Sequence, residues 1–158
     1  QVFDGIKAAL AADRFAYLES FLNDSYNADV LGGTRISGQA WHAAFIAALA
    51  ASAHATHVYV DTWLIDFRPD LRKIDIPTLV IHSADDRILP VTATAQRLPG
   101  FIDDIRVITI DHGPYNITWT HPDEVNTGRL DHSARGSTWL LVRDDSTEDL
   151  RWPTWATR

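Results

Sequence analysis

Two short segments of the sequence carry side chains whose type and position indicate chemistry. In ADDRILP, residues 84–90, the carboxylates Asp85 and Asp86 directly follow the apolar run TLVIHS. In DHGPYN, residues 111–116, a polar loop that contains Tyr115 directly follows a second apolar run, RVITI. A carboxylate close to a polar ring can orient a proton-transfer group. The two segments therefore predict one catalytic or binding site.

The elements that must position this site form a strand, helix, strand unit. Residues 78–83 and 106–110 are short, continuous, β-branched runs, which are typical of parallel strands buried on both faces. Between them, residues 92–98 predict a short helix that Pro99 and Gly100 stop. In such a unit the crossover is right-handed, and the loops after both strands meet at the carboxyl edge of the sheet. Open α/β sheets bind their ligands at this edge.

The residues before this unit predict helices. Apolar residues at helical spacing and runs of alanine mark three helical stretches, residues 3–24, 38–52 and 54–67. Asp4 is the expected N-cap of the first stretch and Ser37 that of the second. The intervening NADVLGGTRIS, residues 27–37, predicts a loop because it contains two glycines.

The residues after the second strand predict one more helix and then an irregular tail. THPDEVNTGRL, residues 120–130, has Pro122 at the expected first helical position and two acids in the first turn. Helical periodicity is lost from about Gly128, and the last twenty residues contain three of the six tryptophans. We expect the tail to be irregular.

Composition narrows the class of protein and of partner. A chain of 158 residues with 46% hydrophobic and 22% charged residues fits one globular domain. A net charge of -7 without a basic run argues against nucleic acid and anionic membranes as partners. No apolar run approaches the roughly 18 residues of a membrane span. Without cysteine there are no disulfides or thiolate metal sites. We expect a cytoplasmic protein that binds a small, weakly polar molecule.

Three segments resemble the cofactor-free, non-haem chloroperoxidases and bacterial arylesterases, a branch of the α/β-hydrolase fold. They are VFDGIKAALAADR, IDIPTLVIHSADDRILP and GPYNITWTHPDEVNT, and the resemblance runs from Val2 to about Thr127. It implies an α/β protein with a partial α/β-hydrolase fold, a helical cap followed by the last βαβ-α portion of a parallel sheet. The expected regions are the cap at 1–73, the hydrolase core at 74–133 and the irregular tail at 134–158.

The resemblance also implies roles for individual residues. Asp86, just before RILP, takes the place of the triad acid, and Tyr115 stands where the family has its catalytic histidine. Trp41, Phe45 and Trp63 are expected to line the apolar substrate pocket under the cap helices. In the family a serine attacks an ester, or forms a peracid from a carboxylic acid and peroxide, and no cofactor takes part.

Two departures from the family predict that this chain is inactive alone. Tyrosine titrates near pH 10 and does not accept a proton at neutral pH as imidazole does. The chain also contains no G-x-S-x-G nucleophile motif and no methionine. We therefore expect a C-terminal fragment of a serine-hydrolase-type protein that lacks its nucleophile and catalytic histidine. The alternative is a non-catalytic remnant that binds a small apolar ligand or a protein partner.

Several histidines offer further interpretations. His112 lies three residues before the family's histidine position and is either a displaced base or a surface residue. His121 is a capping or packing residue, and whether either of them replaces the missing base stays open. His54, His57 and Asp61 share a helix face and contain metal-ligand types, but they lack the H-E-x-x-H spacing. We expect no metal site.

The short sheet predicts low stability for the isolated chain. Two parallel strands leave each strand with an unpaired side, although their apolar residues need cover on both faces. The residues concerned are Leu79, Ile81, Val107 and Ile110. Each of these side chains that stays exposed contributes about 1.5 to 3 kcal/mol less to the free energy of folding than it would if buried. We expect a chain that is marginally stable, dimeric, or dependent on a missing N-terminal half.

Overall fold

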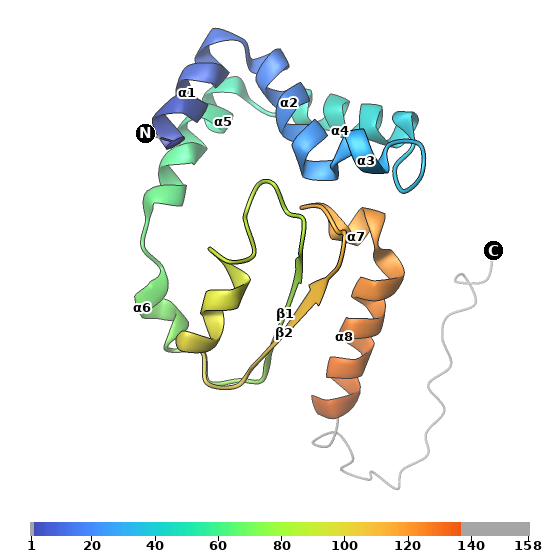
Figure 1. Cartoon of the computed structure of the whole chain (residues 1–158). Helices are drawn as coiled ribbons and strands as arrows, with labels where there is room; N and C mark the ends of the chain where they lie inside the picture. The colour runs from blue at the N-terminus through green and yellow to red at the C-terminus, as the bar shows by residue number, and fades with distance from the viewer. Residues whose placement is uncertain (1, 137–158) are drawn as a thin grey trace, which may run out of the picture.

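The computed structural model describes residues 2–136, with side chains through residue 134. A helical region comes first and consists of α1 (Val2–Ala12), α2 (Arg14–Tyr26), α3 (Ala28–Leu31), α4 (Gly38–Ala50), α5 (Ala53–Tyr59), the 3₁₀ helix η1 (Val60–Leu64) and α6 (Arg68–Leu71). A smaller α/β unit follows and consists of β1 (Thr78–Ser83), the 3₁₀ helix η2 (Ala95–Gly100), β2 (Ile105–Ile110), α7 (Ile117–Thr120) and α8 (Pro122–Gly136). Helices α1 to α5 lie beyond the ends toward which both strand arrows point (Figure 1).

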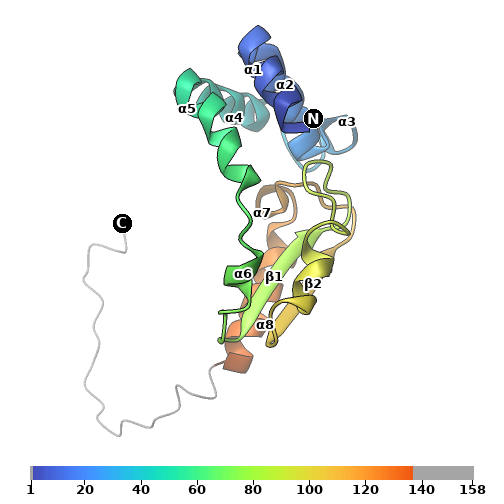
Figure 2. The same cartoon turned by 90° about the vertical axis from the view of Figure 1, so that its left-hand side faces the viewer.

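The strands confirm the predicted parallel unit. β1 pairs with β2 in parallel, with Thr78 opposite Ile105 and Ser83 opposite Ile110. Among residues 2–136 the sheet has these two strands only. Helix α8 packs against both of them, and Figure 2 shows it running beside the sheet. The loops after the two strands therefore emerge side by side, below the helical region.

The first helical stretch is broken where the sequence predicted continuity. Asp13 has an extended backbone, and its carboxylate accepts hydrogen bonds from the N–H groups of Phe15 and Ala16, both at 3.0 Å. Asp13 is therefore an N-cap, and it separates α1 from α2. The prediction that Asp4 is an N-cap is wrong, because Asp4 lies inside the first turn of α1. Ser37 caps α4 as predicted, since its hydroxyl accepts from Ala40 N–H at 3.1 Å.

Three other predicted boundaries are wrong for local or tertiary reasons. The predicted loop 27–37 contains the short helix α3. Pro99 and Gly100 belong to η2 rather than ending it, because the fixed φ of proline suits a 3₁₀ helix. Helix α8 continues through Gly128 to Gly136, and at Gly128 it lies so close to the strands that a Cβ atom would be 3.1 Å from Cδ1 of Ile108. The rest of the predicted tail, from residue 137, lies outside the described residues.

Among the described residues, the helical region and the α/β unit each contain a cluster of buried apolar side chains. In the helical region Leu22, Tyr26 and Ile36 are buried together, and partly buried residues of α4 pack against them. Beside the sheet a second cluster consists of Ile110, Ile117 and Val125, with the half-buried Ile81 against it. Of the four apolar strand residues expected to need cover, Ile110 alone is fully buried.

No single helix among residues 2–136 is long and apolar enough to cross a membrane. The pair Gly38–Ala50 and Ala53–Leu64 passes that test together, with a bend of 91° between its two parts.

Candidate active site

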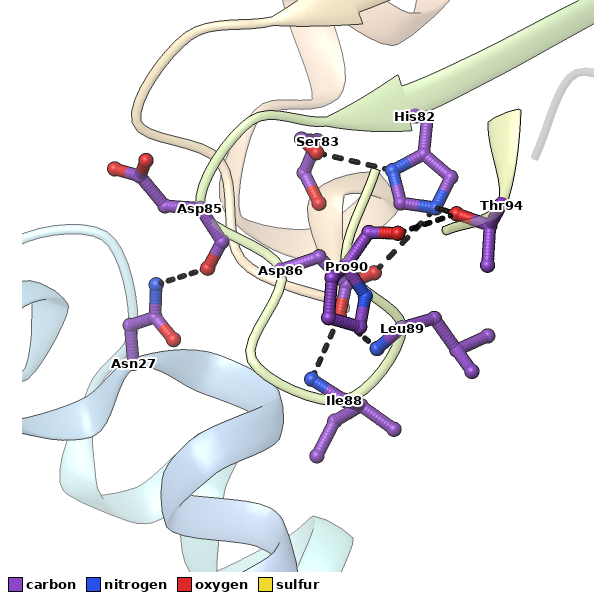
Figure 3. A network of polar contacts seen from close by, with 9 residues as sticks. All are labelled: Asn27, His82, Ser83, Asp85, Asp86, Ile88, Leu89, Pro90 and Thr94. Carbon is purple, nitrogen blue, oxygen red and sulfur yellow. Dashed lines mark hydrogen bonds and ion pairs between the residues drawn. The ribbon is translucent and has the colours of Figure 1, made fainter. Parts of the chain in front are cut away.

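Asp86 is buried at the carboxyl end of β1, in the loop that the sequence singled out. Its side chain is 4% exposed. One carboxylate oxygen, Oδ1, accepts hydrogen bonds from the N–H groups of Ile88 at 2.8 Å and Leu89 at 2.7 Å (Figure 3). Two backbone donors hold this oxygen in place and stabilise the turn that carries RILP. The other oxygen, Oδ2, is left to face neighbouring side chains.

The second predicted loop is joined to the Asp86 loop by its backbone. Ala84 N–H donates to Ile110 C=O at 2.9 Å, and Asp85 N–H donates to Gly113 C=O at 3.1 Å. These bonds continue the parallel pairing past the ends of β1 and β2. The structure thus brings the segments around Asp86 and Tyr115 to one edge of the sheet, as the sequence predicted. Tyr115 itself is 42% exposed and, among residues 2–136, makes no hydrogen bond to Asp86.

Neither histidine that could replace the missing base contacts Asp86. The side chain of His112 is 90% exposed, its φ is +58°, and its Nδ1 lies 3.5 Å from a carboxylate oxygen of Asp85. His121 is buried, and its Nδ1 lies 2.8 Å from the hydroxyl of Thr120. Burial lowers the pKa of His121, and the charge of Arg35 lowers it further. The fold therefore disfavours the protonated ring of His121, and the ring has a hydrogen-bonding partner in Thr120.

The structure instead places His82, which sequence reasoning missed, next to the acid. Its Nε2 lies 3.7 Å from Oδ2 of Asp86. His82 is the fifth residue of β1 and directly follows the three apolar residues Leu79, Val80 and Ile81. A ring that can transfer protons, four residues before the predicted acid and near the end of the predicted strand, was the signal that could have identified it.

The three aromatic residues predicted to line a substrate pocket lie in two places. Trp41 and Phe45 stack on each other in α4, with ring centroids 5.4 Å apart, and pack against the buried cluster of the helical region. Trp63 lies in η1 and lines an open surface pocket of about 360 Å³ between residues of α1, α2, α5 and η1. The other residues that line this pocket are mostly apolar or aromatic, among them Leu10, Tyr17 and Phe21.

The helical region is attached directly to the loops that carry the site. The side-chain amide of Asn27 donates to Asp85 C=O at 3.0 Å (Figure 3). From the other loop, Asn116 N–H donates to Ser25 C=O at 3.0 Å. These bonds come from the end of α2, so the position of that helix and the position of the acid are coupled.

An ion pair adds to this attachment. Arg87, the residue after Asp86, donates from both guanidinium NH₂ groups to the carboxylate of Asp29, at 2.7 and 3.1 Å. The hydrogen bond from Arg87 lowers the pKa of Asp29. Because both side chains are solvent-exposed, the pair contributes little to stability and mainly orients α3 on the loop.

The histidines considered for metal binding do not form a cluster. Among the described residues no three His, Asp or Glu side chains are placed to share a metal ion. Asp61 pairs with Lys7 of α1. His54 and His57 therefore lie on α5 without Asp61 as a shared third ligand.

Comparisons with known proteins found related sequences and similar solved structures. A putative non-heme chloroperoxidase of Synechocystis sp. is 50% identical over 125 residues, which are 79% of this chain and 45% of that relative. The crystal structure of a bromoperoxidase from Bacillus anthracis superimposes with a TM-score of 0.78 at 27% identity and covers 84% of this chain and 48% of that one. An esterase from Exiguobacterium antarcticum has a TM-score of 0.69 at 17% identity, over 84% of this chain and 46% of the esterase, and supports the fold alone. No family model matches the chain. The chain spans about half the length of the curated relatives it matches.

Proposed function

We infer that this chain, which belongs to the α/β-hydrolase fold and is related to the C-terminal part of the non-heme chloroperoxidases, supplies the acid and the helical cap of a serine-hydrolase-type site. The observation that carries the proposal is the environment of Asp86. It is a buried carboxylate at the carboxyl end of a parallel strand, with one oxygen held by two backbone N–H groups. A triad acid needs this fixed orientation in order to align an imidazole.

The proposed reaction needs two groups from elsewhere. A serine hydroxyl would attack an ester or a carboxylic acid, and an imidazole aligned by Asp86 would take the serine proton. No G-x-S-x-G motif occurs in the 158 residues, and Tyr115 stands at the expected histidine position. We therefore propose that the chain is inactive alone and acts with a polypeptide that carries the nucleophile, as a partner or as a second half of the same fold. A cytoplasmic location is part of the same proposal.

Ester hydrolysis tests this proposal in two stages. The purified chain should hydrolyse p-nitrophenyl acetate no faster than buffer, and a serine-directed phosphonate should have no effect on the rate. Phosphonate-sensitive hydrolysis by the chain alone would show that a nucleophile is present after all.

In the second stage the chain is mixed with the N-terminal half of the Synechocystis relative, cut where the similarity begins. We expect complex formation and esterase activity, since each part would then have its complement. Asp86→Asn should lower that activity at least about a hundredfold, as loss of a triad acid does. The matched variant Asp85→Asn, which changes the exposed neighbouring carboxylate, should leave it nearly unchanged. Equal activity of the two variants would refute the role of Asp86.

A second candidate function rests on the apolar pocket beside Trp63. A pocket of about 360 Å³ with an apolar, aromatic lining has the size and character of a small-molecule site. A chain without catalysis would then act by binding a small apolar ligand. Saturable quenching of tryptophan fluorescence by a compound such as 1-naphthol, lost in Trp63→Ala and retained in Trp119→Phe, would support this function. Unsaturable quenching would exclude it.

A further inference from the structure

The polar cluster at the end of β1 contains two side chains that the triad scheme does not use. Figure 3 shows His82 and Thr94 lying beside the Asp86 turn. Nδ1 of His82 lies 3.0 Å from Ser83 C=O, and Nε2 lies 3.1 Å from the hydroxyl of Thr94. The hydroxyl of Thr94 also lies 2.9 Å from Pro90 C=O. These contacts join the strand, the Asp86 turn and the segment that follows it.

The two oxygens of Asp86 have different partners. Oδ1 accepts from two backbone N–H groups, whereas Oδ2 has His82 Nε2 as its nearest charged or chargeable neighbour among the described residues, at 3.7 Å. The two oxygens lie in one plane, so a rotation about the Cβ–Cγ bond that displaced Oδ2 would also break the hydrogen bonds to Oδ1. The ring of His82 lies against Oδ2 and therefore opposes the same rotation from the other side of the carboxylate.

Counting protons shows that His82 is poorly placed to act as a base. A carbonyl oxygen only accepts hydrogen bonds, so Nδ1 must carry a proton to bond to Ser83 C=O. The single hydroxyl proton of Thr94 can go to Pro90 C=O or to Nε2 but not to both. Nε2 therefore either accepts from a hydroxyl that no longer donates to Pro90 C=O or, in the doubly protonated ring, donates to the Thr94 oxygen. In both charge states the two ring nitrogens already have protein partners. A substrate proton would have to displace one of them.

The ring of His82 is mostly covered by protein, since its side chain is 15% exposed. It lines an open pocket of about 350 Å³, whose lining also includes the cationic side chains of Arg68, from α6, and Arg97, from η2. Arg68 is already bound to Asp66 through two hydrogen bonds. Among the described residues, Asp86 is the one carboxylate paired with this ring.

We propose that His82 is a positioning residue for Asp86, held by Ser83 C=O and the Thr94 hydroxyl so that its Nε2 side fixes the orientation of the carboxylate. We call His82 and Thr94 the Asp86 clamp. This inference rests on the proposed role of Asp86 for its functional meaning, but its geometry is independent of catalysis. In a triad, the second oxygen of the acid is otherwise held by the catalytic base alone. Here the clamp also contacts that oxygen.

Ring-nitrogen NMR of the full 158-residue chain tests the first part. With ¹⁵N-labelled histidine, His82 should show a protonated Nδ1 throughout the range from about pH 6 to about pH 8, on either side of the ordinary histidine pKa. The His82 resonances are assigned with His82→Phe. A tautomer with a proton on Nε2 and a free lone pair on Nδ1 would overturn the proposal, since that ring could not bond to Ser83 C=O and would be available as a base.

Amide hydrogen exchange tests the second part. Thr94→Val removes the hydroxyl at nearly constant shape and should accelerate exchange of the Ile88 and Leu89 amides about tenfold, the size expected for loss of one hydrogen bond. Thr94→Ser keeps the hydroxyl and should restore slow exchange. Thr92→Val makes the same chemical change at an exposed position of the same segment and should have no effect.

These measurements separate this inference from the proposed function. Unchanged exchange at Ile88 and Leu89 in Thr94→Val, in a chain whose other amide signals show a folded protein, would overturn the clamp even if Asp86 proves essential for catalysis. Accelerated exchange in Thr94→Val and also in His82→Phe, which keeps the bond from Thr94 to Pro90 C=O, with rescue by Thr94→Ser, would support the clamp even if the mixed chains have no esterase activity. Equal acceleration by Thr94→Ser would also count against it, because the hydroxyl would then not matter.

Discussion

Asp85 and Asp86 are neighbours in the chain but lie in opposite environments. The side chain of Asp85 is 55% exposed beside His112, whereas that of Asp86 is 4% exposed and bonded to the backbone. The difference follows from the turn after β1, in which the second carboxylate caps the N–H groups of the RILP segment. Of these two carboxylates, Asp86 is therefore the candidate for a catalytic acid that must be held in one orientation.

At the same scale, Gly113 allows the second loop to approach the first. A Cβ atom there would lie 2.7 Å from Cγ2 of Ile117 and 3.1 Å from Cβ of Ser83. Gly113→Ala should therefore lower the free energy of unfolding by about 1 to 3 kcal/mol, the usual cost of overpacking. Urea denaturation followed by circular dichroism measures the change.

Gly128→Ala is the matched control for this prediction. Its Cβ would lie 3.1 and 3.2 Å from the flexible Cδ1 atoms of Ile108 and Ile81, which can shift. Alanine also gains about 1 kcal/mol of helix propensity in α8. The net change should be close to zero. Equal destabilisation by both substitutions would contradict the packing described for Gly113.

The buried position of His121 predicts how the stability of the fold depends on pH. Burial lowers its pKa from the ordinary 6.5, so the folded state binds this proton less readily than the unfolded state does. Above the ordinary value both states are neutral and the group contributes nothing. As pH falls below that value, the unfolded chain takes up the proton first and stability is lost.

The measurement compares unfolding midpoints at about pH 7 and about pH 5.5, a window set by the ordinary histidine pKa. His121→Asn keeps a polar partner for Thr120 and should lose less stability between the two pH values than the wild type does. His54→Asn, a change at an exposed position of α5, should behave like the wild type. A pH dependence that His121→Asn leaves unaltered would refute the assignment.

At the scale of elements, the end of α2 determines how the helical region sits on the site. Asn27 ends α2 in the left-handed conformation, with φ of +46°, and its side chain donates to Asp85 C=O. At the other end of the bundle Arg14 donates to the last carbonyls of α4, including Ala51 C=O at 2.7 Å. A cation at a helix C-terminus is stabilising. These hydrogen bonds thus hold α2 to α4 and hold the helical region to the loop that carries Asp86.

Substitutions of Asn27 separate the contribution of its side-chain hydrogen bond from that of its left-handed backbone conformation. Asn27→Gly keeps the left-handed backbone and loses the hydrogen bond, so it should lower the free energy of unfolding by about 1 kcal/mol. Asn27→Ala loses both and should cost about 1 kcal/mol more, because a Cβ disfavours this conformation. Urea denaturation gives both values. If the glycine variant were the less stable of the two, the contribution of the backbone conformation would be refuted.

At the scale of the whole molecule, two small clusters and a two-stranded sheet leave much apolar surface exposed. The chain from η1 to α6 runs down one side of the molecule (Figure 2) and carries Trp63, Leu64, Ile65 and Phe67, all between 47 and 62% exposed. Exposed apolar segments of this kind mark interaction surfaces. This exposure is in line with the prediction of a chain that is marginal, dimeric or dependent on a second polypeptide.

Association should therefore depend on this segment. We expect sedimentation of the wild type to show dimers or larger species, and its unfolding midpoint to rise with protein concentration. Ile65→Lys and Phe67→Lys should shift the distribution toward monomer. A matched substitution at an exposed polar position, Gln96→Lys, should not. A wild-type monomer with one cooperative calorimetric transition would contradict the prediction.

The sequence by itself determined the features that depend on local pattern. β-branched runs gave both strands and their parallel pairing, Ser37 marked a helix start, and the position of Asp86 just after a buried strand placed it at the carboxyl edge. The missing nucleophile motif and the tyrosine at position 115 were likewise visible in the sequence.

The tertiary structure decided whatever depends on distant contacts. The contact of His82 with Thr94, the bond from Asn27 to the Asp85 carbonyl, and the packing of α8 on the sheet at Gly128 each join segments that no local pattern relates. Periodicity and capping report on neighbours a few residues apart. Side chains twelve or more residues apart meet only once the strands and helices have packed, because packing alone brings them within bonding distance.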